Sequence, residues 1–107
     1  MSIKSMTALE LKEQLEKKDE LVLVDCRELD EWQSGHIKEA IFIPLSEFQN
    51  HLNKLPNKNV PIILQCRSGQ RSMRAAEYLA EQGYTDLTNL EGGILGWAHH
   101  GLPIDFE

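Results

Sequence analysis

The stretch "VPIILQCRSGQRSMRAAEYLAEQG", residues 60–83, decides the fold of this protein. Its apolar run 60–64 predicts a buried strand, and the pattern over residues 72–82 predicts a helix. Between them lies a short polar loop that begins at Cys66 and carries Arg67 and Arg71. In parallel sheets ligands bind where a strand ends and a helix begins, and Cys66 lies at such a junction.

The same alternation of strand and helix patterns extends along the rest of the chain. Short apolar runs predict strands at 20–25, 40–44, 60–65 and, more weakly, 86–90. Helices are predicted after capping boxes at Thr7–Glu10 and Ser46–Gln49, over 72–82, and after the glycine pair 92–93. The sequence therefore predicts an α/β fold, a single three-layer domain over residues 1–107 with helices on both faces of a parallel sheet.

The composition is that of an ordinary soluble globular protein, with 41% hydrophobic and 26% charged residues. Its formal net charge of −6 argues against nucleic acid and anionic membranes as partners, because both require a basic surface. We expect no membrane span and no signal peptide. The two cysteines, Cys26 and Cys66, form neither a disulfide framework nor a metal-binding motif. These features predict a reduced, cytoplasmic protein without a metal.

The residues around Cys66 favour the thiolate, which is the nucleophilic form of cysteine. The loop leads into a helix N-terminus, where unpaired N–H groups and the helix dipole attract negative charge. Gly69 allows a tight curl of backbone amides, and Arg67 and Arg71 add permanent positive charge. The same surroundings bind a small anion. The sequence therefore predicts a cysteine that attacks an anionic electrophile and carries the product covalently.

Residues of this loop also have purely structural interpretations. A lone cysteine is often a small buried hydrophobe, and either arginine could be a solvated surface charge. Ser72 is expected to be the N-cap of the following helix rather than a reacting group. Our interpretation takes Cys66 as the catalytic residue. The predicted substrate-binding residues, acting largely through their backbone, are Arg67, Ser68, Gly69, Gln70, Arg71 and Ser72.

Three segments of the chain resemble the signatures of the rhodanese (thiosulfate sulfurtransferase) family, in the family's order and at similar separations. They are "LVDCRELDEWQSGHIKEAIFIP" at 23–44, "CRSGQRS" at 66–72 and "LEGGILGWAHHGLP" at 90–103. The resemblance covers about residues 5–106 and implies a single rhodanese-like domain with a five-stranded parallel sheet. The segment "SIKSM", residues 2–6, is then the candidate for the fifth strand.

The resemblance implies a sulfurtransferase that works in two half-reactions without a metal or an organic cofactor. The Cys66 thiolate takes the outer sulfur of a small anionic donor such as thiosulfate. The resulting persulfide passes this sulfur to a thiophilic acceptor, which is cyanide, a thiol or a protein. The sequence leaves the physiological donor and acceptor open, and the expected oligomeric state is a monomer.

Two other functions are open to this fold. Cell-cycle dual-specificity phosphatases share the fold that the resemblance implies, but their loop has one more residue between its cysteine and its arginine. In this chain four residues separate Cys66 from Arg71. The shorter loop suits a sulfur atom better than a phosphate ester, and it argues equally against an arsenate reductase. A catalytically silent binding module is the other alternative. Such modules often lack the cysteine, whereas this chain keeps the whole loop.

Residues of the first motif have expected roles as well. Cys26 stands where the family more commonly has valine or another apolar residue. It is expected to pack as a small hydrophobe, with a resolving thiol for the catalytic cysteine as the alternative. Asp25, Arg27 and Glu28 are expected to hold loops together through charge-assisted hydrogen bonds. His36 is expected to be structural rather than a general base.

Overall fold

A parallel sheet forms the centre of the molecule. The structure, a computed structural model, describes residues 3–17 and 20–106, and within them five strands pair in the order β1-β5-β4-β2-β3. The strands are β1 (Lys4–Met6), β2 (Val22–Asp25), β3 (Ala40–Phe42), β4 (Ile62–Gln65) and β5 (Leu87–Leu90), all parallel. The helices are α1 (Ala8–Lys17), α2 (Leu29–Gln33), the 3-10 helix η1 (Leu45–Lys54), α3 (Gln70–Glu81) and α4 (Gly93–His99).

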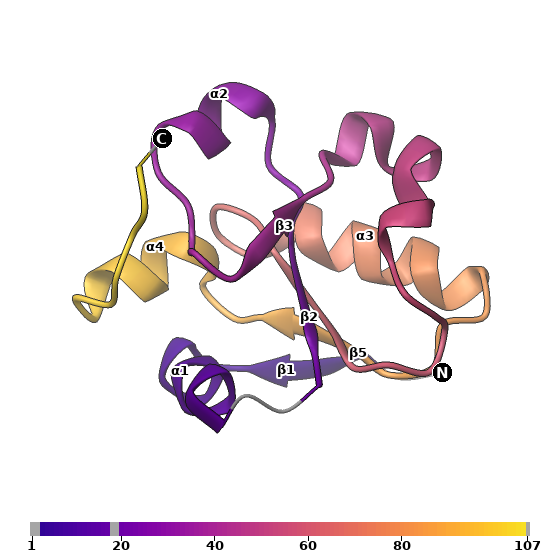
Figure 1. Cartoon of the computed structure of the whole chain (residues 1–107), viewed down its shortest axis with the longest axis horizontal. Helices are drawn as coiled ribbons and strands as arrows, with labels where there is room; N and C mark the ends of the chain where they lie inside the picture. Colours follow the sequence, from indigo (N-terminus) through magenta and orange to yellow (C-terminus); the bar gives the residue numbers. More distant parts are fainter. Residues whose placement is uncertain (1–2, 18–19, 107) are drawn as a thin grey trace.

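Helices cover both faces of this sheet (Figure 1). α3 and η1 pack on one face, and α1 and α4 pack on the other. Because side chains alternate along a strand, Ile62 and Leu64 point into the core beneath α3 and η1, whereas Ile63 points into the core beneath α1 and α4. All of β4 is buried, which accounts for its continuous apolar sequence. The predicted α/β fold is confirmed.

The carboxyl ends of β2, β4 and β5 lie at one end of the sheet. α2 follows β2, the loop 66–69 follows β4, and α4 follows β5 at this end (Figure 1). Segments far apart in sequence therefore meet around the loop that begins with Cys66. Among the residues that the structure describes, no helix combines the length and the apolar character needed to cross a membrane.

The N-terminal predictions are confirmed. β1 occupies Lys4–Met6 within the predicted strand 2–6, of which Ser2 lies outside the described residues. The capping box is present: the backbone N–H of Thr7 donates to Oε1 of Glu10 at 2.9 Å, and the N–H of Glu10 donates to Oγ1 of Thr7 at 3.2 Å. These bonds satisfy two of the unpaired N–H groups at the start of α1.

The predicted capping box of Ser46 and Gln49 is wrong. η1 begins after Pro44 without a side-chain cap, and the hydroxyl of Ser46 donates instead to Oε1 of Glu28 at 2.7 Å. A charge-assisted bond of this kind is stronger than a bond to a backbone N–H. It joins the start of η1 to the segment that precedes α2.

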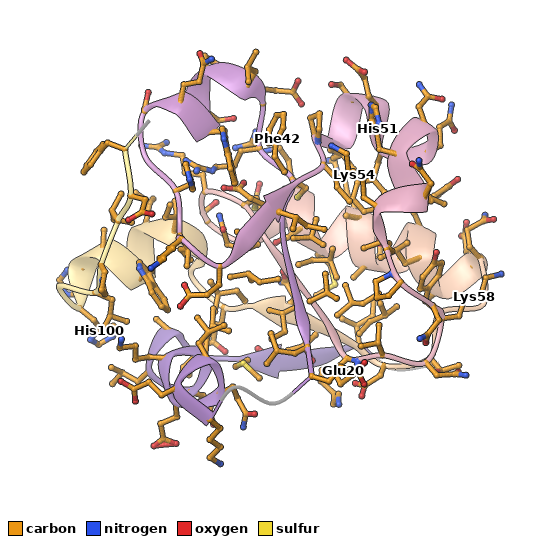
Figure 2. The ribbon with its side chains drawn as sticks, viewed as in Figure 1. Glu20, Phe42, His51, Lys54, Lys58 and His100 are labelled. Atoms are coloured by element: carbon orange, nitrogen blue, oxygen red, sulfur yellow. The ribbon has the colours of Figure 1, made fainter. Side chains whose placement is uncertain are left out.

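The helix of this segment also differs from the regular one that the apolar spacing predicts. Phe48 is buried as expected, but the helix is of the 3-10 type, and Glu47 and His51 have non-helical φ and ψ angles. The segment is therefore two short pieces joined across a kink. Its end is fastened to β3, because Nζ of Lys54 donates to the carbonyl oxygen of Phe42 at 3.1 Å (Figure 2).

α3 begins two residues earlier than the predicted start at Ser72. Its N-cap is Gly69, whose φ of 113° lies in the region that favours glycine. This turn brings the chain into the helix at Gln70. Ser72 consequently lies inside the first turn of the helix and is not its N-cap, which corrects the prediction.

Candidate active site

Cys66 is the first residue after β4, and it lies beneath the loop that leads into α3. The residue is only 1% exposed, whereas Arg67, Ser68 and Gln70 are exposed at the surface. The predicted loop residues therefore lie together, with Cys66 buried beneath exposed polar side chains. On its other side the sulfur borders the hydrophobic core beneath α3 and η1.

Hydrogen-bond donors surround the Cys66 sulfur on the loop side. The backbone N–H of Gly69 donates to Sγ at 3.1 Å, and the hydroxyl of Ser72 lies 3.3 Å from the same atom. The backbone N–H of Ser72 also contributes to the lowered pKa of the Cys66 thiol. Both N–H groups belong to the start of α3, where they lack partners within the helix. A backbone N–H group at the start of α3 thus bonds to the Cys66 sulfur, and anion binding by the loop stays a prediction.

Ser72 is fully buried and belongs to a small polar network. Its hydroxyl lies within hydrogen-bond distance of both Cys66 Sγ and Oδ1 of Asn89, so its single proton is available to either. The amide nitrogen of Asn89 donates to the carbonyl oxygen of Gly69 at 3.1 Å. Asn89 on β5 thus positions both the Ser72 hydroxyl and the loop that holds the sulfur.

The start of α4 fixes the direction of the loop peptides. The backbone N–H of Ile94 donates to the carbonyl oxygen of Cys66 at 2.9 Å, and that of Leu95 donates to the carbonyl oxygen of Arg67 at 3.1 Å. The side-chain amide of Gln65 also donates to the Cys66 carbonyl, at 2.8 Å. These bonds hold the two loop carbonyl groups against the start of α4.

This contact requires a glycine at position 93. A Cβ atom there would lie 2.4 Å from the carbonyl oxygen of Arg67 and 2.6 Å from that of Cys66, and the residue has a φ of 58°. Any side chain would therefore push α4 away from the loop. The turn that the sequence predicts at Gly92 and Gly93 is confirmed, and its close approach to the loop explains the second glycine.

These surroundings lower the pKa of the Cys66 thiol to about 4. The largest cause is a hydrogen bond from the thiol of Cys26, followed by the bonds from the hydroxyl and N–H of Ser72 and from the N–H of Gly69. Burial opposes the shift, because it disfavours the charged form. Hydrogen bonds to the thiolate, rather than the arginine charges that the sequence suggests, are thus the leading cause.

Cys26 lies beside Cys66 in the core. It is fully buried and follows β2 just as Cys66 follows β4, and both cysteines are free. The hydrogen bond to Cys66 raises the pKa of Cys26, and burial adds to this effect. Cys26 therefore remains a neutral thiol that donates to its neighbour. Its packing agrees with the expected small hydrophobe, but its contact gives it a second role.

The two arginines differ in their surroundings. Arg71 forms a two-point ion pair with Glu31 of α2, with N–O distances of 2.7 and 2.8 Å. This pair lowers the pKa of Glu31 to about 2, chiefly through the hydrogen bonds from Arg71. Arg67 is exposed and has no ion-pair partner among residues 3–17 and 20–106. Arg67 is therefore the more available of the two for an incoming anion.

The remaining predicted residues hold loops together. The guanidinium of Arg27 pairs with the buried carboxylate of Asp25 at 2.7 Å and donates to the carbonyl oxygen of Gly35 at 2.7 Å. Glu28 accepts the Ser46 bond described above. His36 is buried and its ring stacks on that of Trp32, with centroids 3.7 Å apart. The structural roles predicted for these residues are confirmed.

Two residues of this site were missed from the sequence. Asn89 is a polar residue in a predicted strand, which is a weak signal of a buried hydrogen-bonding role. Glu31 gives no local signal, since its partner Arg71 is 40 residues away. Within the described residues, no group of three or more His, Cys, Asp or Glu side chains is arranged to hold a metal ion.

The lowered pKa predicts how the reactivity of Cys66 depends on pH. The rate of alkylation by iodoacetamide should stay nearly constant at neutral pH and fall about tenfold per pH unit below the pKa near 4. An ordinary thiol would instead gain reactivity up to about pH 8.5. A Cys26→Val variant should move the inflection to higher pH, because it lacks the leading donor. An inflection near pH 8.5 in the unaltered protein would contradict this description of the site.

Comparison with known proteins agrees with the fold. The family model of the rhodanese-like domain matches residues 7–100. The chain is 39% identical over 94 residues to a sulfurtransferase of Allochromatium vinosum, covering 88% of this chain and 87% of that protein. It is 33% identical over 101 residues to the thiosulfate sulfurtransferase GlpE of Coxiella burnetii, covering 94% of this chain and 92% of that protein.

A solved structure gives the same result. The crystal structure of a rhodanese-like domain protein from Staphylococcus aureus superimposes with a TM-score of 0.87 at 34% sequence identity, covering 98% of this chain and 99% of that chain. The family inferred from three sequence motifs is thus matched by the family model, by relatives of similar length and by a solved fold. The chain belongs to the family of rhodanese-like domains.

Proposed function

We propose that this protein is a sulfurtransferase in which Cys66 is the nucleophile and carries the sulfur as a persulfide. The observation that carries the proposal is the environment of the Cys66 sulfur, which receives hydrogen bonds from Gly69 and Ser72 at the start of α3. Relatives with sulfurtransferase names support the same class of reaction. Thiosulfate is proposed as a donor because one of these relatives is a thiosulfate sulfurtransferase.

In the first half-reaction, the Cys66 thiolate attacks the outer sulfur of thiosulfate. A bond forms between the two sulfur atoms, the sulfur–sulfur bond of thiosulfate breaks, and sulfite leaves with the electron pair. The negative charge then lies on the outer sulfur of the Cys66 persulfide. The N–H groups of the loop stabilise this charge as they stabilise the thiolate. Metal and organic cofactors have no part in this step.

In the second half-reaction, a cyanide ion or a thiolate attacks the outer sulfur, and the Cys66 thiolate leaves. A thiol with a low pKa is a good leaving group in such exchange reactions. The pKa of about 4 therefore assists the release of sulfur as well as its capture. We propose a thiol or a protein as the cellular acceptor, and a cytoplasmic location, where such acceptors remain reduced.

Arg67 is proposed to attract the anionic donor. Because the protein has a net charge of −6, an anion must be held by local positive charge, and Arg67 is exposed and directly follows Cys66 in the chain. Arg71 is proposed to contribute less directly, since Glu31 already holds its guanidinium. This division modifies the equal roles that the sequence suggests for the two arginines.

Single substitutions of the two arginines test the different roles proposed for Arg67 and Arg71. Arg67→Ala should raise the KM for thiosulfate by about tenfold with kcat nearly unchanged, because a charge-assisted contact is worth about 1.5–3 kcal/mol. Arg71→Ala should lower kcat as well, because it also frees Glu31 and α2 beside the loop. Steady-state kinetics measure both parameters, and Arg67→Lys is the control that keeps the charge. An unchanged KM in Arg67→Ala would remove this residue from donor binding.

The two alternative functions are tested by the same purified protein. Turnover of thiosulfate and cyanide to sulfite and thiocyanate would support the sulfurtransferase. Release of phosphate from an aryl phosphate, without thiosulfate turnover, would support a phosphatase. Absence of both activities in a protein with a reactive Cys66 would favour a silent binding module. We favour sulfur transfer because the loop between Cys66 and Arg71 is short and the sulfur is closely surrounded by its donors.

A further inference from the structure

Cys26 and Cys66 form a buried pair on adjacent strands. Asp25 of β2 and Gln65 of β4 are paired in register, and the backbone N–H of Cys26 donates to the carbonyl oxygen of Gln65 at 2.9 Å. The two cysteines are the next residues of these two parallel strands, and both belong to the core beneath α3 and η1. Their side chains therefore lie next to each other on the same face of the sheet.

This spacing fits a disulfide. Neighbouring strands lie about 4.7–4.9 Å apart, and disulfides join Cα atoms about 4.4–6.8 Å apart. Both thiols are free in the structure. A bond between them would need rotation of the two side chains and little movement of the sheet.

We propose that Cys26 is the resolving thiol of Cys66, and that the two cysteines close a reversible intramolecular disulfide when a peroxide oxidises Cys66. The proposal concerns an oxidative modification and not sulfur transfer. It requires only that Cys66 is a reactive thiolate, so it stands even if the substrate of the enzyme differs from the one proposed above.

The chemistry needs a peroxide as the only oxidant. The Cys66 thiolate attacks one peroxide oxygen, the oxygen–oxygen bond breaks, and a sulfenic acid forms as water or an alcohol leaves after taking up a proton. The sulfur of Cys26 then attacks the Cys66 sulfur. A sulfur–sulfur bond forms, the sulfur–oxygen bond breaks, and the hydroxide leaves as water with the proton of Cys26. The two thiols lose two electrons and the peroxide gains them.

The surroundings of Cys26 explain why it reacts after Cys66 and not before. In the reduced protein, the hydrogen bond to the Cys66 thiolate and the negative charge of that thiolate raise the pKa of Cys26. A sulfenic acid on Cys66 is uncharged, so these two causes disappear once Cys66 is oxidised. Cys26 is also fully buried, which keeps it from external oxidants and leaves Cys66 as its neighbouring target.

The disulfide would protect Cys66 from irreversible oxidation. Without a resolving thiol, a sulfenic acid is oxidised further to sulfinic and sulfonic acids, which ordinary thiols do not reduce. A disulfide is returned to two thiols by a small thiol reductant. The pair would therefore give Cys66 a reversible oxidised state.

The test treats the reduced protein with hydrogen peroxide in the absence of any sulfur donor, then blocks remaining thiols by alkylation under denaturing conditions. Intact mass should show a chain that has lost two hydrogen atoms and gained no alkyl group. Peptide mapping should find residues 26 and 66 cross-linked within one chain. Dithiothreitol should restore more than nine tenths of the Cys66 labelling by iodoacetamide, by analogy with other reversible disulfides.

Two variants serve as controls. Cys26→Val keeps the shape of the core, and Cys26→Ser gives an independent test if the first variant fails to fold. In either variant, the same treatment should add two or three oxygen atoms to Cys66, and dithiothreitol should not restore its labelling. The proposal is overturned if the unaltered protein also accumulates these oxygen adducts with Cys26 still open to alkylation. A disulfide between two chains would overturn it equally.

Discussion

A Cys66→Ser protein will transfer sulfur from thiosulfate to cyanide at least about a thousandfold more slowly than the unaltered protein, by analogy with other removed nucleophiles. Serine has nearly the same shape, so the hydrogen bonds from Gly69 and Ser72 can persist. However, its hydroxyl does not ionise near neutral pH and cannot form a persulfide. The loss should therefore appear in kcat, measured by thiocyanate formation at saturating thiosulfate.

Thermal unfolding of the same variant provides the control. Its melting temperature should remain close to that of the unaltered protein, because the exchange changes one atom in a site that already contains hydrogen-bond donors. A folded Cys66→Ser protein that retains a tenth or more of the activity would show that sulfur does not pass through residue 66.

The second large effect is expected from Gly93→Ala, which should both destabilise the protein and slow sulfur transfer. The new Cβ would lie 2.4 Å from the carbonyl oxygen of Arg67, closer than a Cβ atom approaches a non-bonded atom, so α4 and the loop must separate. Strain of this kind costs about 1–3 kcal/mol, and the positive φ adds about 1–2 kcal/mol. The hydrogen bonds from Ile94 and Leu95 to the loop carbonyls would lengthen as a result.

Gly101→Ala is the matched control for this variant. Gly101 also has a positive φ, of 71°, but within residues 3–17 and 20–106, apart from its two chain neighbours, no atom lies within 4 Å of the position of its Cβ. It should therefore lower the melting temperature through backbone strain alone and leave kcat nearly unchanged. If the two variants lose equal stability and equal activity, the contact between α4 and the loop does not position the site. Calorimetry and steady-state kinetics measure these effects.

The fold could be predicted because its strands and turns have local signals. The apolar run before Cys66 is buried on both faces of the sheet, and such a run gives a clear strand pattern. The adjacent glycines Gly92 and Gly93 likewise predict a turn. The η1 segment was predicted less well, because the apolar spacing that buries Phe48 is compatible with both a regular helix and a kinked 3-10 helix.

The position of Ser72 shows why a local rule can fail. Serine before a helical pattern is a good N-cap, but Gly69 can adopt a turn that serine cannot and so takes that position. The Ser72 hydroxyl is then used by Cys66 and by Asn89, which comes from another strand. The role of Ser72 therefore depends on Asn89, which is distant from it in sequence.

Other parts of the site depend on the order of the strands. Cys26 and Cys66 each follow a predicted strand, but their contact exists because β2 and β4 are neighbours in register. The same holds for Glu31 and Arg71, which meet because α2 and α3 begin at the same end of the sheet. The position of Cys66 and its loop at the end of β4 could therefore be predicted from sequence, whereas the leading cause of the low pKa of Cys66 could not.

The most direct test of sulfur transfer through Cys66 is the mass of the protein after a single treatment with thiosulfate. We expect the chain to gain the mass of one sulfur atom, the gain to map to the peptide that contains Cys66, and cyanide to remove it with formation of one thiocyanate per chain. Sulfite should appear in equal amount during the first step. An unchanged mass after thiosulfate, or a sulfur atom bound at Cys26 while Cys66 remains free, would contradict this account.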